Sequence, residues 1–203
     1  LHVIPPFELP VHWERLKGID YGYASESCCL WGILDINDNT LLIYRELYRK
    51  GLTGQELGAI ITDMEIEDPF SVNGVLDTAA WANTGTTGPT VGEELLKAGH
   101  KLRRADKNRV QGKIQIHEYL KVTQSGRPRL QIFNTCPNLI RELQSIPLDK
   151  SNPEDVNTHA PDHAYDALRY LIMSRPRIND PLSQMRQIQR EQVFRPVDST
   201  FGY

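Results

Sequence analysis

The sequence predicts an α/β fold in which helices flank a mixed sheet, made of a three-strand antiparallel meander and further parallel strands. Three strand-like runs lie close together at 16–24, 28–36 and 40–49. After them, helix-like and strand-like segments alternate, as in domains whose strands are covered by helices. The 203 residues, 39% of them hydrophobic, suffice for the core of one domain.

The turns between the first three runs predict the meander. Ser25-Glu26 separates the first two runs, and Asn37-Asp38-Asn39, which is rich in turn formers, separates the next two. A capping box, Thr53-Gly54-Gln55-Glu56, follows, with apolar residues behind it at helical spacing. We therefore expect a helix of about 12 residues after the third strand.

The middle of the chain alternates between short strands and helices. A mainly apolar strand at 71–77 ends in Asp77 and precedes a Gly/Thr-rich loop at 84–89. The expected elements that follow are a helix at 89–98, a short run at 101–104, a helix at 107–120, a strand at 129–133, a helix at 137–146 and an irregular segment at 147–159. This alternation is typical of an α/β domain.

The last predicted helix, at 161–174, combines an apolar face with an acidic one. Pro161 suits an early helical position. At about 100° per residue, one side collects Ala164, Ala167, Leu168, Leu171 and Ile172. The other side collects Asp162, Asp166 and, further round, His163. We expect this helix to bury the first face and to present its acids on the second.

The two ends of the chain differ from the domain predicted at 16–174. Residues 1–15 contain three prolines and are expected to be a linker or arm, as in a chain cut from a longer one. Residues 175–203, rich in Pro, Gln and Arg, are expected to form a loosely ordered tail with one amphipathic piece near 181–192. No internal repeat is present.

Composition excludes several classes of protein. No apolar run approaches the roughly 18 residues of a membrane span, and the first residues lack a signal-peptide pattern. The three cysteines form neither a disulfide framework nor a metal-spaced cluster, so we expect reduced, mostly buried thiols in a cytosolic protein. The net charge of −3 is modest, but residues 97–113 hold seven Lys/Arg against one acid.

Two acids lie in or directly after apolar strands. Asp20 lies within the first run, and Asp77 closes the fourth. An unpaired buried carboxylate is costly, so each acid requires a partner. If the two strands are neighbours and the late helix presents Asp166 across them, a cation must neutralise the cluster. Oxygen ligands favour a hard divalent ion such as Mg²⁺ or Mn²⁺.

These motifs together resemble the nuclease domain of the large terminase subunit of tailed bacteriophages. The resemblance covers residues 16–174 and depends on Gly18-Ile-Asp20-Tyr-Gly22 with its meander, Val75-Leu-Asp77, and the helix containing Asp162-His163-Ala-Tyr-Asp166. It implies the ribonuclease H-like fold and an endonuclease that cuts double-stranded, concatemeric viral DNA during genome packaging.

The resemblance also implies a catalytic site with two divalent ions, Mg²⁺ or Mn²⁺. It places metal-ligand carboxylates at Asp20, Asp77 and Asp166, with Asp20 bridging both ions. His163 matches a histidine of some relatives that lies in the site; it would position the water or assist the leaving group, or it is an ordinary surface histidine. Asp162 would be an outer ligand, or a favourable charge at the helix N-terminus.

Basic residues after the fourth strand suggest a track for DNA phosphates. The candidates are Lys101, Arg103, Arg104, Lys107, Arg109 and Lys113, with a second patch around a turn that includes Arg127 and Arg129. Taken alone, the first group is better explained as a solvated helix face beside an edge strand. Next to a metal-dependent nuclease site, the interpretation as a DNA surface is favoured.

The family's N-terminal ATPase domain has no counterpart in these residues. No Gly-x-x-x-x-Gly-Lys-Ser/Thr motif occurs, so we expect no ATPase activity from this chain alone. Implied partners are that ATPase domain, the portal protein and the small terminase subunit, in the cytoplasm of the infected bacterium. The alternatives are a junction resolvase or transposase core of the same fold class, and a catalytically silent module that binds a partner.

Overall fold

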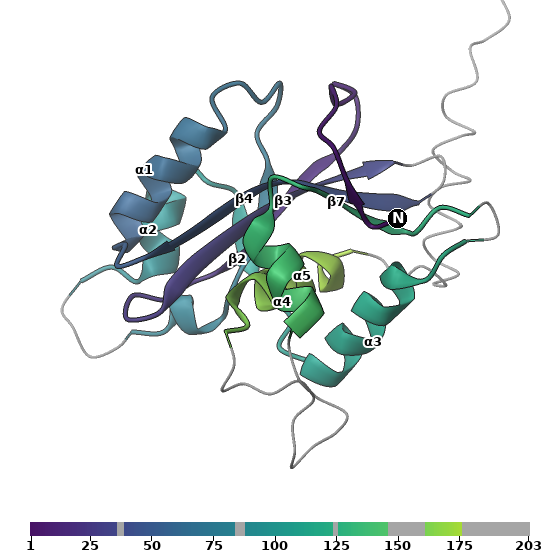
Figure 1. Cartoon of the computed structure of the whole chain (residues 1–203). Helices are drawn as coiled ribbons and strands as arrows, with labels where there is room; N and C mark the ends of the chain where they lie inside the picture. The colour runs from purple at the N-terminus through teal and green to yellow at the C-terminus, as the bar shows by residue number, and fades with distance from the viewer. Residues whose placement is uncertain (36–38, 84–87, 124–125, 146–160, 176–203) are drawn as a thin grey trace, which may run out of the picture.

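A mixed β-sheet with strand order β1-β7-β4-β3-β2-β5-β6 forms the centre of the molecule (Figure 1). The computed structural model describes residues 1–35, 39–83, 88–123, 126–145 and 161–175. Its strands are β1 (Val3–Ile4), β2 (Arg15–Asp20), β3 (Glu26–Asp35), β4 (Thr40–Lys50), β5 (Asn73–Leu76), β6 (Leu102–Arg104) and β7 (Leu130–Phe133). Its helices are α1 (Gly54–Met64), the short 3₁₀ helix η1 (Ala79–Trp81), α2 (Val91–Lys97), α3 (Arg109–Leu120), α4 (Pro137–Ser145) and α5 (His163–Met173).

The strand pairing confirms the predicted mixed sheet. β2, β3 and β4 form the antiparallel meander, and β5, β6, β7 and β1 each pair in parallel with a neighbour. β2 is shorter than the run predicted at 16–24, because it ends at Asp20. Ser27 explains this end, because its hydroxyl donates to the Gly22 carbonyl and accepts from the Gly22 N–H, which closes the turn.

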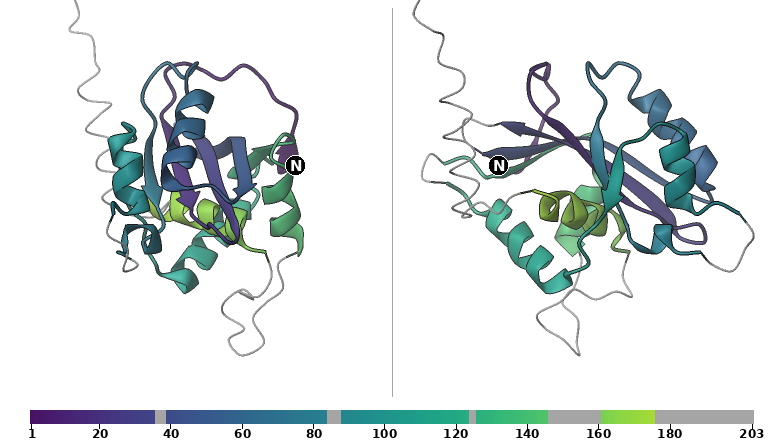
Figure 2. Two further views of the ribbon diagram at one scale, coloured as in Figure 1. Left: turned by 90° about the vertical axis from the view of Figure 1, so that its left-hand side faces the viewer. Right: turned by 180° about the vertical axis from the view of Figure 1, so that it is seen from behind.

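Helices cover both faces of the sheet (Figures 1 and 2). α1 and α2 pack on one face, and α3, α4 and α5 pack on the other. Residues of β3 supply both cores: Cys28 faces α5, and Trp31 faces α1. All three cysteines are free and buried, as predicted.

Side-chain caps define the starts of α1 and α2. The capping box predicted at Thr53 is present, with Glu56 bonded back to the Thr53 N–H. Thr90 and Glu93 form a second capping box, so α2 begins at Val91 and not at residue 89. The spacing Thr-x-x-Glu at 90–93 was a sequence signal for this start.

α5 lies directly against the sheet and is buried along nearly its whole length. Every residue from Ala164 to Ile172 is buried, including Asp166 and Arg169, so the acidic face of the helix lies inside the molecule as well as the apolar face. The reason is that β2 and β3 cover one side of α5, while α3 and α4 flank it. Gly18 permits the close approach, because a Cβ there would lie 2.8 Å from the Cβ of Leu171.

The N-terminal segment belongs to the folded domain. Residues 1–15, expected to be a linker or arm, contribute β1 to the sheet, and Phe7 packs edge-on against Phe133 at 5.3 Å. The sequences at 84–87, 146–160 and 176–203, which include most of the predicted loop, irregular segment and tail, lie outside the described residues. Among the described helices, none is long and apolar enough to cross a membrane.

Candidate active site at the end of the sheet

Asp20 and Asp77 lie side by side where two parallel strands end. β2 and β5 are neighbours with Ile19 paired to Leu76, and the Asp77 N–H donates to the Ile19 carbonyl at 2.9 Å. Ile19 and Leu76 both pack on the α1 face. Because side chains alternate along a strand, the following residues, Asp20 and Asp77, point to the face that α5 covers.

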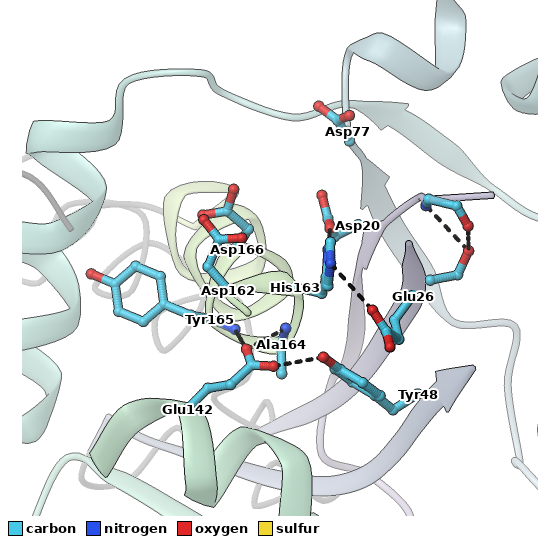
Figure 3. Close-up of polar contacts among 12 residues, drawn as sticks. Asp20, Glu26, Tyr48, Asp77, Glu142, Asp162, His163, Ala164, Tyr165 and Asp166 are labelled. Atoms are coloured by element: carbon cyan, nitrogen blue, oxygen red, sulfur yellow. Dashed lines mark hydrogen bonds and ion pairs between the residues drawn. The ribbon is translucent and has the colours of Figure 1, made fainter. Parts of the chain in front are cut away.

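The start of α5 brings further ionisable groups to the same place. Figure 3 shows Asp20 below Asp77 and beside Asp162 and Asp166, the acids at the start of α5, with His163 next to it. The His163 Nδ1 lies 2.9 Å from Asp20 Oδ2. The structure therefore gathers Asp20, Asp77, Asp166, Asp162 and His163 from two strands and one helix.

Asp20 is the most perturbed acid of this group. Burial raises its pKa to about 6, the His163 hydrogen bond opposes that rise, and the nearby charges of Asp166 and Asp77 add to it. The carboxylate is thus held in a place where its negative charge is disfavoured. Such a group is a common feature of functional sites.

Cationic and hydroxyl groups of the protein hold the other acids. Asp166 accepts from Arg169 Nε at 3.0 Å and from Arg109 Nη1 at 3.2 Å. Arg109 Nη2 also lies 3.5 Å from Asp162 Oδ2. The Tyr170 hydroxyl donates to Asp77 Oδ1 at 3.2 Å. Each carboxylate therefore already has a partner from this chain.

Asp162 occupies the N-cap position of α5 without capping it. Its side chain makes no cap hydrogen bond, and its backbone carbonyl accepts the Asp166 N–H at 2.7 Å. Burial and the charge of Asp166 raise its pKa, while Arg109 opposes this. The side chain of Asp162 is therefore occupied by Arg109 and not by the helix terminus.

His163 links two carboxylates. Its Nε2 lies 3.6 Å from Glu26 Oε2, on the side opposite to Asp20. The hydrogen bond to Asp20 raises the His163 pKa, and partial burial opposes that effect. An imidazole held at one nitrogen by a carboxylate has a fixed ring orientation, which favours a site role over that of an ordinary surface histidine.

The residues fit a divalent metal ion in kind and in charge. All the carboxylate donors are oxygen ligands, and the burial and mutual repulsion that raise the pKa of Asp20 are effects that a cation would relieve. Within the part of the chain that the structure describes, no three His, Cys, Asp or Glu side chains form a ready-made metal centre. An ion bound there would therefore compete with the present partners of the acids.

The basic residues predicted to bind DNA separate into three groups. Lys101, Arg103, Arg104 and Lys107 are exposed along or beside β6, the strand next to β5; we call these four the basic edge. Arg109 contacts Asp166 and Asp162. Lys113 is only 9% exposed, so its side chain is poorly placed to contact a DNA phosphate. Arg127 and Arg129 come just before β7, and the start of β7 aligns with the start of β2. Because Asp20 is at the end of β2, these two arginines lie at the opposite end of the sheet from Asp20.

Several residues of the site were not found from the sequence. Arg169 was recognisable in principle, since it lies three residues after Asp166 on one helix. Tyr170, Glu26 and Glu142 gave no such signal, because their contacts to Asp77, His163 and the start of α5 join distant parts of the chain.

Comparison with known proteins identifies the class of fold. No family model matches the sequence, and no curated protein matches it. Solved structures do match. The nuclease domain of the P22 large terminase aligns with a TM-score of 0.69 at 16% identity, over 85% of this chain and 87% of that one. The architecture is therefore the ribonuclease H-like fold.

The particular form of that fold is the one found in phage large terminases. The large terminase of a thermophilic bacteriophage matches with a TM-score of 0.67 at 17% identity over 85% of this chain, which spans 42% of that protein. The nuclease domain of the SPP1 large terminase, solved with bound Mn, matches with a TM-score of 0.53 at 16% identity, over 78% of this chain and 84% of that one. At the level of the fold, the resemblance read from the motifs is confirmed.

Proposed function

We propose that this chain is a metal-dependent endonuclease that cuts double-stranded DNA, acting as the nuclease domain of a phage large terminase. The observation that supports this most directly is the meeting of Asp20, Asp77 and Asp166 at the end of two parallel strands. The terminase-like fold and the Mn bound to the SPP1 domain agree with it. The proposed ligands are these three acids, with Mg²⁺ or Mn²⁺ as the ions.

In phosphodiester hydrolysis, the role of each residue would follow from its position in the site. Bound divalent ions supply Lewis-acid activation of the attacking water and of the scissile phosphate. Asp20, on which the charges of Asp77 and Asp166 both act, would hold two ions, while Asp77 would hold one and Asp166 the other. His163, which contacts Asp20 through Nδ1 and Glu26 through Nε2, would hold or release a proton for the water or the leaving oxygen once it exchanges one of these partners.

The biological setting extends the same proposal. A large-terminase nuclease would cut concatemeric viral DNA during packaging, in the cytoplasm of the infected bacterium. Its partners would be an ATPase domain of the full-length protein, the portal and the small terminase subunit. Because this chain lacks a phosphate-loop motif, we expect it to cut DNA without hydrolysing ATP.

A plasmid assay tests the proposed activity. Supercoiled plasmid incubated with the protein and Mn²⁺ or Mg²⁺ should become nicked and then linear, and EDTA should prevent both changes. The Asp77→Asn protein, purified in parallel, should leave the plasmid intact, which excludes a contaminating host nuclease as the source of cutting. Intact plasmid with the wild type at high protein concentration in both metals would contradict the proposal.

We expect Arg109→Ala to bind Mn²⁺ more tightly than the wild type. Arg109 pairs with Asp162 and Asp166 and is 28% exposed at its side chain, so it competes with an incoming cation for the same oxygens. A partly exposed ion pair is worth up to about 1 kcal/mol, which corresponds to a Kd lowered by up to about fivefold. Isothermal titration with Mn²⁺ measures this, and Lys97→Ala on α2 is the control. Weaker binding by Arg109→Ala would contradict the competition.

The basic edge should contribute to DNA affinity in a salt-dependent way. In EDTA, which prevents cleavage, the double variant Arg103→Ala/Lys107→Ala should bind duplex DNA more weakly and with a smaller salt dependence. Each lost phosphate contact lowers the slope of log K against log[salt] by about 0.9. Fluorescence anisotropy across a salt series measures the slope. An equal loss in Arg127→Ala, which removes an exposed charge at the opposite end of the sheet from Asp20, would show that the effect is general charge and not this surface.

A further inference from the structure

Glu142 supplies the start of α5 with its hydrogen-bond acceptor. This glutamate belongs to α4 and is only 1% exposed. Its Oε2 accepts from the Ala164 N–H at 2.8 Å and from the Tyr165 N–H at 3.0 Å, and its Oε1 accepts from the Tyr48 hydroxyl at 2.8 Å (Figure 3). Every helix begins with N–H groups that lack an intrahelical partner. Here a side chain from another helix satisfies two of them.

The local sequence of α5 does not provide this cap. Asp162 occupies the N-cap position, but its side chain makes no cap hydrogen bond and instead faces Arg109. Since the first turn of α5 contains His163 and Asp166, the position of that turn sets where both groups meet Asp20. The two N–H groups that Glu142 binds lie between them in the sequence.

Glu142 is itself held in place by a similar contact one helix earlier. Glu46 of β4 accepts from the N–H groups of Asn138 and Leu139 at the start of α4, at 3.1 Å and 2.7 Å. The sheet thus fixes α4 through Glu46, and α4 fixes α5 through Glu142. A carboxylate near a helix N-terminus is also favoured by the helix dipole.

We propose that Glu142 is a positioning residue for the metal site: by capping α5 from outside, it fixes Asp166 and His163 relative to Asp20. This inference rests on the proposed function. Burial raises the pKa of Glu142, while its hydrogen bonds to Tyr165, Tyr48 and Ala164 favour the charged form. Tyr48 therefore orients the Glu142 carboxylate through its hydroxyl group.

Mn²⁺ affinity and amide hydrogen exchange together test whether Glu142 positions the metal site. In Glu142→Ala, the Mn²⁺ Kd should rise about tenfold, the lower end of the effect found for groups that orient metal ligands. Glu142→Gln keeps an acceptor for the two N–H groups and should restore most of the affinity. The matched control is Glu56→Ala, which removes the capping-box carboxylate of α1 on the other face and should leave Mn²⁺ affinity unchanged.

Hydrogen exchange of the Ala164 and Tyr165 amides reports on the cap without depending on metal or on a folded alanine variant. In the wild type both amides should be protected, and Glu142→Gln should keep them protected. Free exchange of both amides in the wild type would overturn the inference, as would wild-type Mn²⁺ affinity in a folded Glu142→Ala. If the wild type itself binds no Mn²⁺, the proposed metal site fails at that step, and the Glu142 variants are not needed to show it.

Discussion

Asp20→Asn is expected to lower Mn²⁺-dependent DNA cleavage by more than about 100-fold, because even the outer partners of metal ligands are worth 10- to 100-fold. The charges of Asp166 and Asp77 both act on Asp20, and in the proposed function Asp20 is the acid that would hold both ions. Asparagine keeps the size of the side chain and an acceptor for His163. Initial rates of plasmid nicking measure the loss, with an EDTA-treated wild-type sample as the baseline.

The same substitution should leave the fold at least as stable as the wild type. It removes a carboxylate that is buried beside two other acids, which is a source of instability in the absence of metal. Thermal unfolding in EDTA measures this. Asp63→Asn, which neutralises an exposed acid on α1, is the matched control and should retain activity. If Asp20→Asn keeps half of the wild-type rate, Asp20 is not a metal ligand.

Gly18→Ala should destabilise the protein by about 1–3 kcal/mol or more, the usual cost of adding a methyl group to a closely packed core. Gly18 lies on β2 where α5 crosses it, and a Cβ there would collide with the Ala167 carbonyl and lie 2.8 Å from the Leu171 Cβ. Neither partner is the end of a flexible side chain. The helix that contains Asp166 must therefore move away from the strand that contains Asp20.

Two measurements separate the parts of this prediction. Urea unfolding gives the loss of stability, and Mn²⁺ titration of the folded variant should show weaker binding because Asp20 and Asp166 are further apart. Gly88→Ala is the control, since a Cβ at Gly88 has no neighbour within 4 Å. Unchanged stability in Gly18→Ala would contradict the close packing of α5 on β2 at Gly18.

The fold was predictable because its signals are local. The turn formers at 37–39 and the capping box at 53–56 depend on neighbouring residues, so the meander and α1 were placed within a few residues of their true bounds. The predicted α5 was also in the right place. The burial of all its residues from 164 to 172 was not predicted, because helical periodicity describes which residues share a face and does not reveal how many neighbours pack around the helix.

The sequence by itself determined the order of the main elements from β2 to α5 and singled out three acids as candidates, since each lies in or beside an apolar segment in which an unpaired charge is costly. Only the tertiary structure decided what those acids contact. It placed Arg109 on Asp166, buried Lys113, and moved Arg127 and Arg129 to the far end of the sheet. It also revealed Glu142 at the start of α5. These contacts join residues far apart in the chain, so strand order and helix packing decide them and local sequence does not.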